Sequence, residues 1–247
     1  MVGEVYGYGI SAGQFYDFGD KKVNYFKNGL SNLINFEFKW NAKELKSYEE
    51  LFSKYNTSLH DENQLKNYGL LNYMTSHDDG SPFDKNRTKT FEAATKLLLT
   101  LGTSQIYYGD ESARSLVING AEGDANLRGN MNWNEINSDK EKKALLKHWQ
   151  KLGKFRRGHV AVGAGIHTML SEKPYIFKRE YVKNGIEDRV IIGLDLTKGE
   201  KIIDVSSMFE DGELIRDAYS NQHLKVNKGK VIINSDYGIV LLEKQNK

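Results

Sequence analysis

The chain has 247 residues, enough for one large domain or two small ones with a substantial core. Its formal net charge is +2, and basic and acidic residues are interspersed, so neither nucleic acid nor a membrane is an expected partner. Cysteine is absent, which excludes disulfides, cysteine nucleophiles and thiolate metal sites.

Residues 1–160 alternate short apolar runs with amphipathic helical patterns, which is typical of βα units around a parallel sheet. Strands are expected at residues 1–6, 33–38, 70–75 and 104–108, and helices at residues 21–28, 45–55 and 91–101. Gly102 is expected to end the third of these helices. Ser138 and Glu141 predict a capping box ahead of a further helix that carries Leu145 and Phe155.

Residues 161–247 carry short β-rich runs that are separated by turn signals. The runs cover residues 175–181, 189–194, 201–205, 231–234 and 239–242. This spacing predicts a small antiparallel β-sandwich domain.

The segment Asn72–Asp79 is the most informative, because an apolar run ends there in His77 and Asp78 before a Gly-Ser-Pro turn. In a TIM barrel, residues at the carboxyl ends of the parallel strands face the active site. The alternative from these residues alone is a structural His-Asp pair, with the aspartate as a helix cap.

Two other predicted strands end in acidic residues. Glu4 follows the first strand and precedes a loop rich in Tyr, Phe and Gly, where Tyr6 offers a ring face that suits a pyranose. The alternative is an exposed glutamate beside aromatic residues that cover the end of the sheet. Asp110 and Glu111 follow the fourth strand, and we expect them to orient neighbouring loops rather than to react.

A long loop, residues 109–134, follows the fourth strand, and long loops in compact domains are often functional. Within it, Asp124 and Arg128 can bind sugar hydroxyls or, equally, pair with each other and stiffen the loop. His148 on the next helix is expected to be structural. The acidic residues lack the spacing of an EF-hand loop, so no metal site is predicted.

The order GEVYG, LINFEF, LNYMTSHDD and TSQIYYGDE resembles the last four strands of the catalytic barrel of the α-amylase superfamily, glycoside hydrolase family thirteen. This resemblance covers nearly the whole chain. It implies an α/β fold class, with the carboxyl-terminal half of a TIM (β/α)8 barrel over residues 1–160. A carboxyl-terminal all-β domain, the small antiparallel β-sandwich, would follow over residues 161–247.

The resemblance also implies roles for site residues. Glu4 would be the general acid/base and Asp78 the stabiliser of the oxocarbenium-like transition state, while His77 would bind the sugar. The loop GDANLRGNMNW is similar to a family loop that shapes the donor subsites, which makes Asp124 and Arg128 substrate-binding candidates beside Tyr6. Asp79 stands where many relatives have asparagine.

The same resemblance implies what this chain lacks. The first four strands, with the aspartate nucleophile, should precede Glu4, so no nucleophile is expected here and the chain alone should be almost inactive. The usual calcium site draws on the same missing half. No cofactor is therefore expected in this chain, although a full-length relative could bind calcium.

The expected partners are an α-glucan, such as starch or a maltooligosaccharide, and an amino-terminal half-barrel chain. Three hypotheses stay open: the carboxyl-terminal portion of a retaining α-glucan hydrolase, a noncatalytic glucan-binding or interaction module, and one half of a split amylase. Hydrolysis and glycosyl transfer are both compatible with the first. The native amino terminus is expected to lie upstream, so secretion, a periplasmic location and a cytoplasmic one all stay open.

Overall fold

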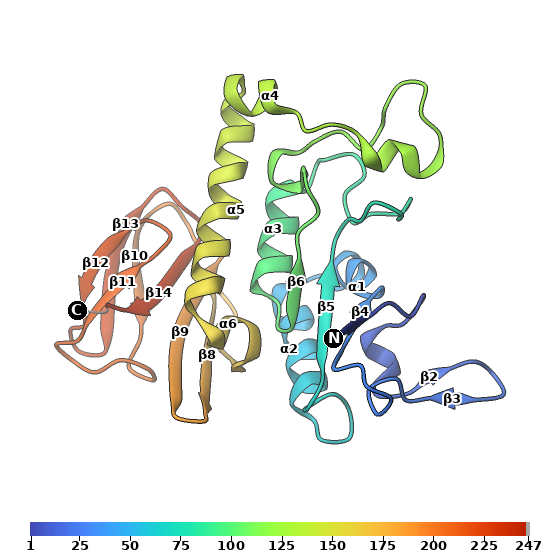
Figure 1. The fold of residues 1–247 in the computed structure, drawn as a ribbon. Coiled ribbons are helices and arrows are strands. Elements are labelled where there is room, and N and C mark those ends of the chain that lie inside the picture. The colour runs from blue at the N-terminus through green and yellow to red at the C-terminus, as the bar shows by residue number, and fades with distance from the viewer. Residues whose placement is uncertain (246–247) are drawn as a thin grey trace. The chain divides into compact units, whose positions relative to one another are not determined.

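The computed structural model describes residues 1–245, which form a mixed α/β structure with one parallel sheet and several antiparallel strand pairs (Figure 1). Contacts divide the chain into two units, one that ends at Leu152 and one that begins at Gly153. Within the described part of the chain, no helix combines the length and the apolar character that a membrane span requires.

The first unit is built on a parallel sheet with the strand order β1-β4-β5-β6. Its strands and helices are β1 (Val2–Gly3), η1 (Ile10–Ala12), β2 (Tyr16–Asp17), β3 (Lys22–Val23), β4 (Asn32–Asn35), α1 (Phe38–Glu44), α2 (Tyr48–His60), β5 (Gly69–Tyr73), α3 (Thr90–Leu99), β6 (Thr103–Gln105), η2 (Asp110–Ser112), η3 (Gly123–Arg128) and α4 (Trp133–Ser138). Helix α5 (Lys140–Gly158) continues from this unit into the second. Because neighbouring strands of the sheet are all parallel, their carboxyl ends meet at one edge.

Helix α2 shows why the helical segments form where they do. The Ser47 side chain accepts a hydrogen bond from the backbone of Glu50, and the Glu50 carboxylate accepts one from the backbone of Ser47. This capping box satisfies backbone N–H groups that the helix itself leaves unpaired. Leu51, Phe52 and Tyr55 recur on one face and are fully buried, which confirms the helix predicted over residues 45–55, although it begins at Tyr48 and ends at His60.

A buried pair of amides joins the two central strands. Asn35 on β4 and Asn72 on β5 are register partners, and Asn35 Nδ2 donates to Asn72 Oδ1 at 2.8 Å. Asn35 Nδ2 also donates to the Tyr55 hydroxyl at 2.8 Å, and Asn72 Nδ2 donates to the Leu101 carbonyl at 2.9 Å. Both amides are fully buried, so each depends on these partners for its hydrogen bonds.

The helix predicted over residues 21–28 is wrong. Lys22 and Val23 form strand β3, which pairs with β2 in an antiparallel hairpin. After it, the Asn24 side chain accepts a hydrogen bond from the backbone of Lys27, and Gly29 takes φ +100°. This local turn does not propagate into a helix, because Gly29 in the left-handed region ends it.

Several predicted boundaries are also wrong. Strand β1 covers Val2–Gly3 instead of residues 1–6, and β6 covers Thr103–Gln105 instead of residues 104–108. Strand β4 ends at Asn35, and Phe38 begins helix α1 instead of ending the strand. Ser138, the last residue of α4, does not cap α5, because its hydroxyl donates back to the Asn134 carbonyl. The Asp139 carboxylate accepts from the first backbone N–H groups of α5 instead, and a carboxylate at this position also favours the helix dipole.

The second unit is dominated by antiparallel strands. Its elements after α5 are α6 (Val160–Ala164), β7 (Ile166–Ser171), β8 (Tyr175–Lys183), β9 (Ile186–Leu194), β10 (Gly199–Asp204), β11 (Leu214–Asp217), β12 (Gln222–Lys225), β13 (Lys230–Ser235) and β14 (Val240–Lys244). A six-stranded sheet has the order β12-β11-β14-β9-β8-β7, and β10 pairs with β13. Apolar side chains of both sheets share one core, in which Ile191 and Ile233 are fully buried. The five predicted β-runs are confirmed, whereas β7, β11 and β12 were not predicted.

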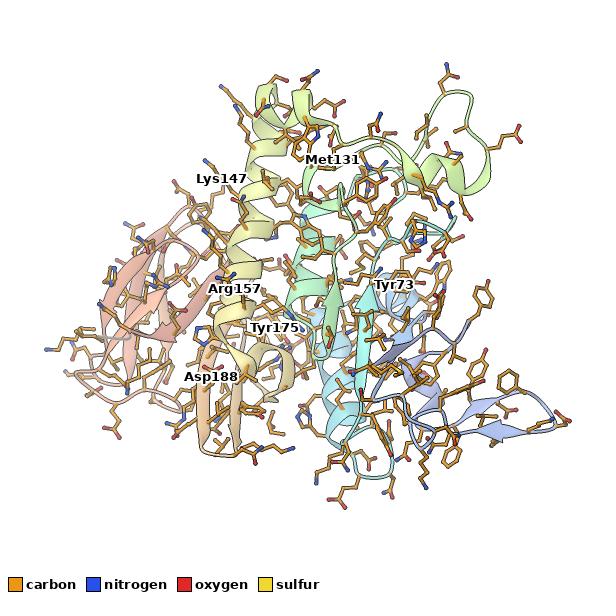
Figure 2. All side chains as sticks on the ribbon, viewed as in Figure 1. Tyr73, Met131, Lys147, Arg157, Tyr175 and Asp188 are labelled. Atoms are coloured by element: carbon orange, nitrogen blue, oxygen red, sulfur yellow. The ribbon has the colours of Figure 1, made fainter. Side chains whose placement is uncertain are left out.

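A histidine at the start of α6 bridges two carboxylates on strands of the six-stranded sheet. His159 Nδ1 lies 2.7 Å from Asp188 Oδ1, and its Nε2 lies 2.7 Å from Glu243 Oε2. Asp188, on β9, is labelled in Figure 2 and also accepts from the backbone of Ala161. Burial lowers the pKa of His159, but the two carboxylates outweigh it and raise the pKa to about 9.

This pKa predicts how stability depends on pH. Because the folded state binds the His159 proton more tightly than the unfolded state does, the stabilisation is complete below pH ~6.5 and is lost as the pH rises through about 9. His159→Gln, which keeps hydrogen-bonding groups but no charge, should lower the free energy of unfolding by about 3 kcal/mol at pH 6 and by little at pH 10. Urea unfolding across this range measures the difference.

The exposed His223 in the same unit provides a matched control. His223→Gln should leave the pH profile of unfolding unchanged. A His159→Gln profile parallel to that of the wild type would contradict the assigned role of the charge.

Candidate functional site

A pocket of about 620 Å³ lies at the carboxyl edge of the parallel sheet. It is lined by residues that follow three neighbouring strands. They are Glu4, Tyr6, Gly7, Gly9 and Ala12 after β1, Phe36, Glu37, Lys39 and Trp40 after β4, and Tyr73, Ser76, Asp78, Asp79, Gly80 and Ser81 at the end of β5 and after it. The volume is in the range of small-molecule sites.

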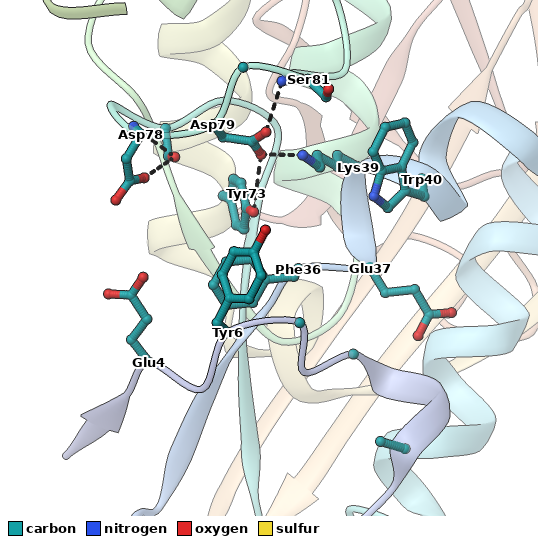
Figure 3. A pocket seen from close by; sticks show the side chains of 15 residues that line it. Glu4, Tyr6, Phe36, Glu37, Lys39, Trp40, Tyr73, Asp78, Asp79 and Ser81 are labelled. Carbon is teal, nitrogen blue, oxygen red and sulfur yellow. Dashed lines mark hydrogen bonds and ion pairs between the residues drawn. The ribbon is translucent and has the colours of Figure 1, made fainter. Parts of the chain in front are cut away.

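Three of the predicted site residues line this pocket, namely Glu4, Tyr6 and Asp78. In Figure 3, Glu4 and Asp78 lie on the same side of the pocket, while Lys39 and Trp40 lie on the opposite side. Glu4 is exposed, and the side chain of Asp78 is about half exposed at 46%. The pocket therefore presents two solvent-accessible carboxylates from different strands on one wall.

Aromatic rings form the wall between these two sides. Tyr6 packs edge-on against Phe36 with ring centroids 5.5 Å apart, and Phe36 packs edge-on against Tyr73 at 5.8 Å. Trp40 is partly exposed, with the Lys39 ammonium 4.7 Å from the centroid of its ring. Such surfaces suit the apolar faces of a sugar ring, while nearby polar groups can bind its hydroxyls.

Asp79 differs from its neighbour Asp78 because it is neutralised. The Lys39 ammonium forms an ion pair with Asp79 Oδ2, and both side chains are largely buried. Tyr73 donates to the same oxygen at 3.2 Å, and the backbone of Ser81 donates to Asp79 Oδ1 at 2.9 Å. Burial, with the charge and the hydrogen bond of Asp79, raises the pKa of Tyr73 far above its ordinary value, so its hydroxyl stays protonated.

The adjacent Asp78 is held by a local turn. Ser76 donates its hydroxyl hydrogen bond to Asp78 Oδ1 at 2.8 Å, and His77 Nε2 lies 3.6 Å from Asp78 Oδ2. The Asp78 carboxylate thus accepts a hydrogen bond within its own turn and does not cap a helix. His77 itself is exposed and lies outside the pocket lining, and Arg128 Nε donates to its carbonyl at 3.0 Å.

The other predicted residues also lie outside the pocket lining. Asp124 is exposed on η3. Asp110 is buried and paired with Arg87 at 2.7 Å, and burial raises its pKa although Arg87 opposes this shift. The Glu111 carboxylate accepts from the backbone of Gly109 at 2.8 Å, so both acids after β6 contact loop residues.

His148 occupies a structural position. It is buried, with Nε2 at 3.1 Å from Thr95 Oγ1 and 3.2 Å from the Phe91 carbonyl. Burial lowers its pKa to about 4, so the ring is neutral at physiological pH.

Sequence reasoning missed the pocket residues Lys39 and Trp40. The predicted strand was extended through Phe38, which hid the fact that Phe36 to Trp40 directly follow a strand that ends at Asn35. An ion pair between residues 39 and 79 has no local sequence signal. The polar, aromatic run after a short apolar strand was the signal that could have been used.

The arrangement has the parts of an acid/base site for a neutral polyol. It offers exposed carboxylates, aromatic faces and a charge-neutral Lys39–Asp79 pair. Among residues 1–245, no cluster of three or more metal-ligating side chains occurs.

Comparisons with known proteins identify relatives. No family model matches the chain. It is 31% identical over 198 residues to the periplasmic alpha-amylase of Escherichia coli (strain K12), an overlap of 78% of this chain and 25% of that protein. The chain thus spans about a quarter of that relative's length.

Solved structures share its fold. An alpha-amylase from Anoxybacillus superimposes with a TM-score of 0.64 and 20% identity, over 100% of this chain and 52% of that one. An AmyP variant solved with maltotriose has a TM-score of 0.66 and 14% identity, over 99% of this chain and 55% of that one. The identity to the E. coli protein shows that this chain is an alpha-amylase homologue, and the shared fold is consistent with a carboxyl-terminal region of an α-amylase.

Proposed function

We propose that this chain supplies the α-glucan-binding and acid/base side of an α-amylase-type retaining glycoside hydrolase. The observation that carries this proposal is the pocket in which Glu4, Tyr6 and Asp78 meet beside aromatic walls. The relative in E. coli is an alpha-amylase, and the AmyP structures contain maltose and maltotriose, which supports an α-glucan as the ligand.

The proposed architecture is the carboxyl-terminal half of a (β/α)8 barrel over residues 1–160 and a β-sandwich domain over residues 161–247. In its support, the parallel strands follow one another in chain order, β1-β4-β5-β6, with helices between the later ones. The two sheets of the second unit share one core. The solved relatives match this chain with roughly half of their own length.

The proposed chemistry assigns one step to each exposed carboxylate. A retaining glycosidase needs one carboxyl group to protonate the leaving oxygen and another to attack the anomeric carbon. Glu4 would be the proton donor, and Asp78 would stabilise the positive charge of the sugar in the transition state. The nucleophile would come from strands outside this chain.

Supporting roles are proposed for the remaining residues. His77 and Arg128, joined by the hydrogen bond to the His77 carbonyl, would bind sugar hydroxyls next to Asp78. Asp124 would contact the sugar from its exposed position on η3. Asp110 and Glu111 would hold the loops after β6.

Two alternatives use the same pocket. A noncatalytic glucan-binding module would bind maltooligosaccharides without turnover, even when an amino-terminal half is supplied. One half of a split amylase would recover activity on co-expression with that half, and the absence of a complex in size-exclusion chromatography would count against it.

The first test of the proposed function is sugar binding by the chain alone. Maltotriose should bind and change the fluorescence of Trp40, which lines the pocket. Asp78→Ala should weaken this binding at least tenfold, because the carboxylate is lost from the wall that faces the sugar. Isothermal titration calorimetry measures the affinities.

Asp236→Ala, at an exposed position in the second unit, is the control and should bind normally. Failure of the wild-type chain to bind maltotriose would contradict the proposed ligand.

The second prediction concerns catalysis. The chain alone should not hydrolyse maltooligosaccharides at an ordinary amylase rate, whereas a complex with a chain that carries the first four barrel strands should. In that complex, Glu4→Gln should lower kcat by about 10²–10⁴-fold, the usual contribution of a general acid. An active monomer that loses its activity on Glu4→Gln would refute the view that it lacks essential parts.

The third prediction tests the buried ion pair beside Asp78. Lys39→Met leaves Asp79 with a largely buried, unpaired charge, so it should lower the free energy of unfolding by about 3 kcal/mol and also weaken maltotriose binding. Lys43→Met is a matched control, since Lys43 is exposed on the same helix and also approaches Trp40. Equal effects of the two substitutions in urea unfolding would contradict the role given to the pair.

A further inference from the structure

Three large aromatic side chains near the amino end are exposed to solvent. Tyr6 is 86% exposed, Phe15 48% and Phe18 51%. Single exposed apolar residues are ordinary, but a group of them is typical of a binding surface. The β2–β3 hairpin that carries Phe18 projects from the first unit in Figure 1.

The hairpin holds the Phe18 ring in a defined position. Tyr16 pairs with Val23 and Asp17 pairs with Lys22, so the two pairs lie on opposite faces of the hairpin. At the tip, Phe18 N donates to the Lys21 carbonyl at 2.8 Å.

Aromatic contacts on one face of the hairpin also fix the position of Phe18. Phe18 packs edge-on against Tyr16, with centroids 5.0 Å apart and an interplanar angle of 84°. Tyr25 lies 6.5 Å from Phe18. The rings are therefore positioned before any ligand binds, which reduces the entropy that binding would cost.

The hairpin is connected to the pocket through Tyr6. Tyr16 donates its hydroxyl hydrogen bond to the Tyr6 carbonyl at 2.9 Å. The ring of Tyr6 lines the pocket and packs on Phe36, inside it. This hydrogen bond thus joins the aromatic group of the pocket wall, Tyr6 and Phe36, to the aromatic group of the hairpin, Tyr16 and Phe18.

We propose that this hairpin, with Tyr6 and Phe18, is a second sugar-binding platform for the units of a linear α-glucan that extend beyond the pocket. This inference rests on the proposed function, because it takes the same ligand. A pocket of about 620 Å³ holds only a short oligosaccharide, so a longer chain must cross the neighbouring surface. Ring faces there can stack on pyranose rings whatever their position in the chain. The platform makes the affinity depend on chain length.

The test compares maltotriose with maltoheptaose on the full 247-residue chain by calorimetry. The wild type should bind the longer sugar about tenfold more tightly, a difference of about 1.4 kcal/mol. Phe18→Ala should remove this advantage and leave the affinity for maltotriose unchanged. Lys22→Ala, on the opposite face of the same hairpin, is the matched control and should keep the advantage.

A second variant distinguishes loss of the stacking ring from misfolding of the hairpin. Phe18→Trp keeps a stacking surface, so it should retain the chain-length advantage. Its added indole should change fluorescence with maltoheptaose but not with maltotriose, after subtraction of the wild-type signal.

Each outcome decides between the two proposals. Equal wild-type affinities for both sugars, or an advantage that survives Phe18→Ala, would overturn the platform and leave the pocket intact. If neither sugar binds, the proposed function itself fails and the platform falls with it. A change of mass in size-exclusion chromatography on Phe18→Ala, without an effect on sugar binding, would make the patch a protein interface and overturn the proposal.

Discussion

The hydrogen bond between the buried amides of Asn35 and Asn72 fixes the register on which the site depends. A shift of register would break this bond and remove a partner from each of two buried amides, and an unsatisfied buried polar group costs about 1–3 kcal/mol. The correct register sets how far each strand reaches at the carboxyl edge. Phe36 follows Asn35 directly, and the loop that carries Asp78 begins a few residues after Asn72, so the amide pair determines the relative height of two pocket walls.

The pocket contains two kinds of acidic group, and the distinction follows from two lysines. Lys39 pairs with Asp79 and Lys54 pairs with Glu37, while Glu4 and Asp78 stay accessible to solvent. Under the proposed function, the sugar ring develops positive charge in the transition state. It would then have the Glu4 and Asp78 carboxylates on one side and the charge-neutral Lys39–Asp79 pair on the other. The neutral side then provides shape and hydrogen bonds, and the charged side favours the transition state.

Sequence reasoning succeeded where the signal is local. Apolar runs that end in Gly-Glu or His-Asp-Asp predicted the strands and brought Glu4, Tyr6 and Asp78 to one edge, because parallel strands end together. It failed where the contact is distant or where a glycine ends a turn that the pattern extends into a helix. The Lys39–Asp79 ion pair joins residues 40 positions apart, and the Asn24 turn replaced a predicted helix.

The outer strands of the parallel sheet, β1 and β6, span two and three residues in the described structure. An edge this short exposes few backbone donors and acceptors, which protects the sheet from promiscuous strand addition. A polypeptide that docks there gains little from main-chain hydrogen bonding. Selectivity among docking partners would then depend on complementary side chains. Two partners with the same strand geometry could bind this edge with different affinities because their side chains differ.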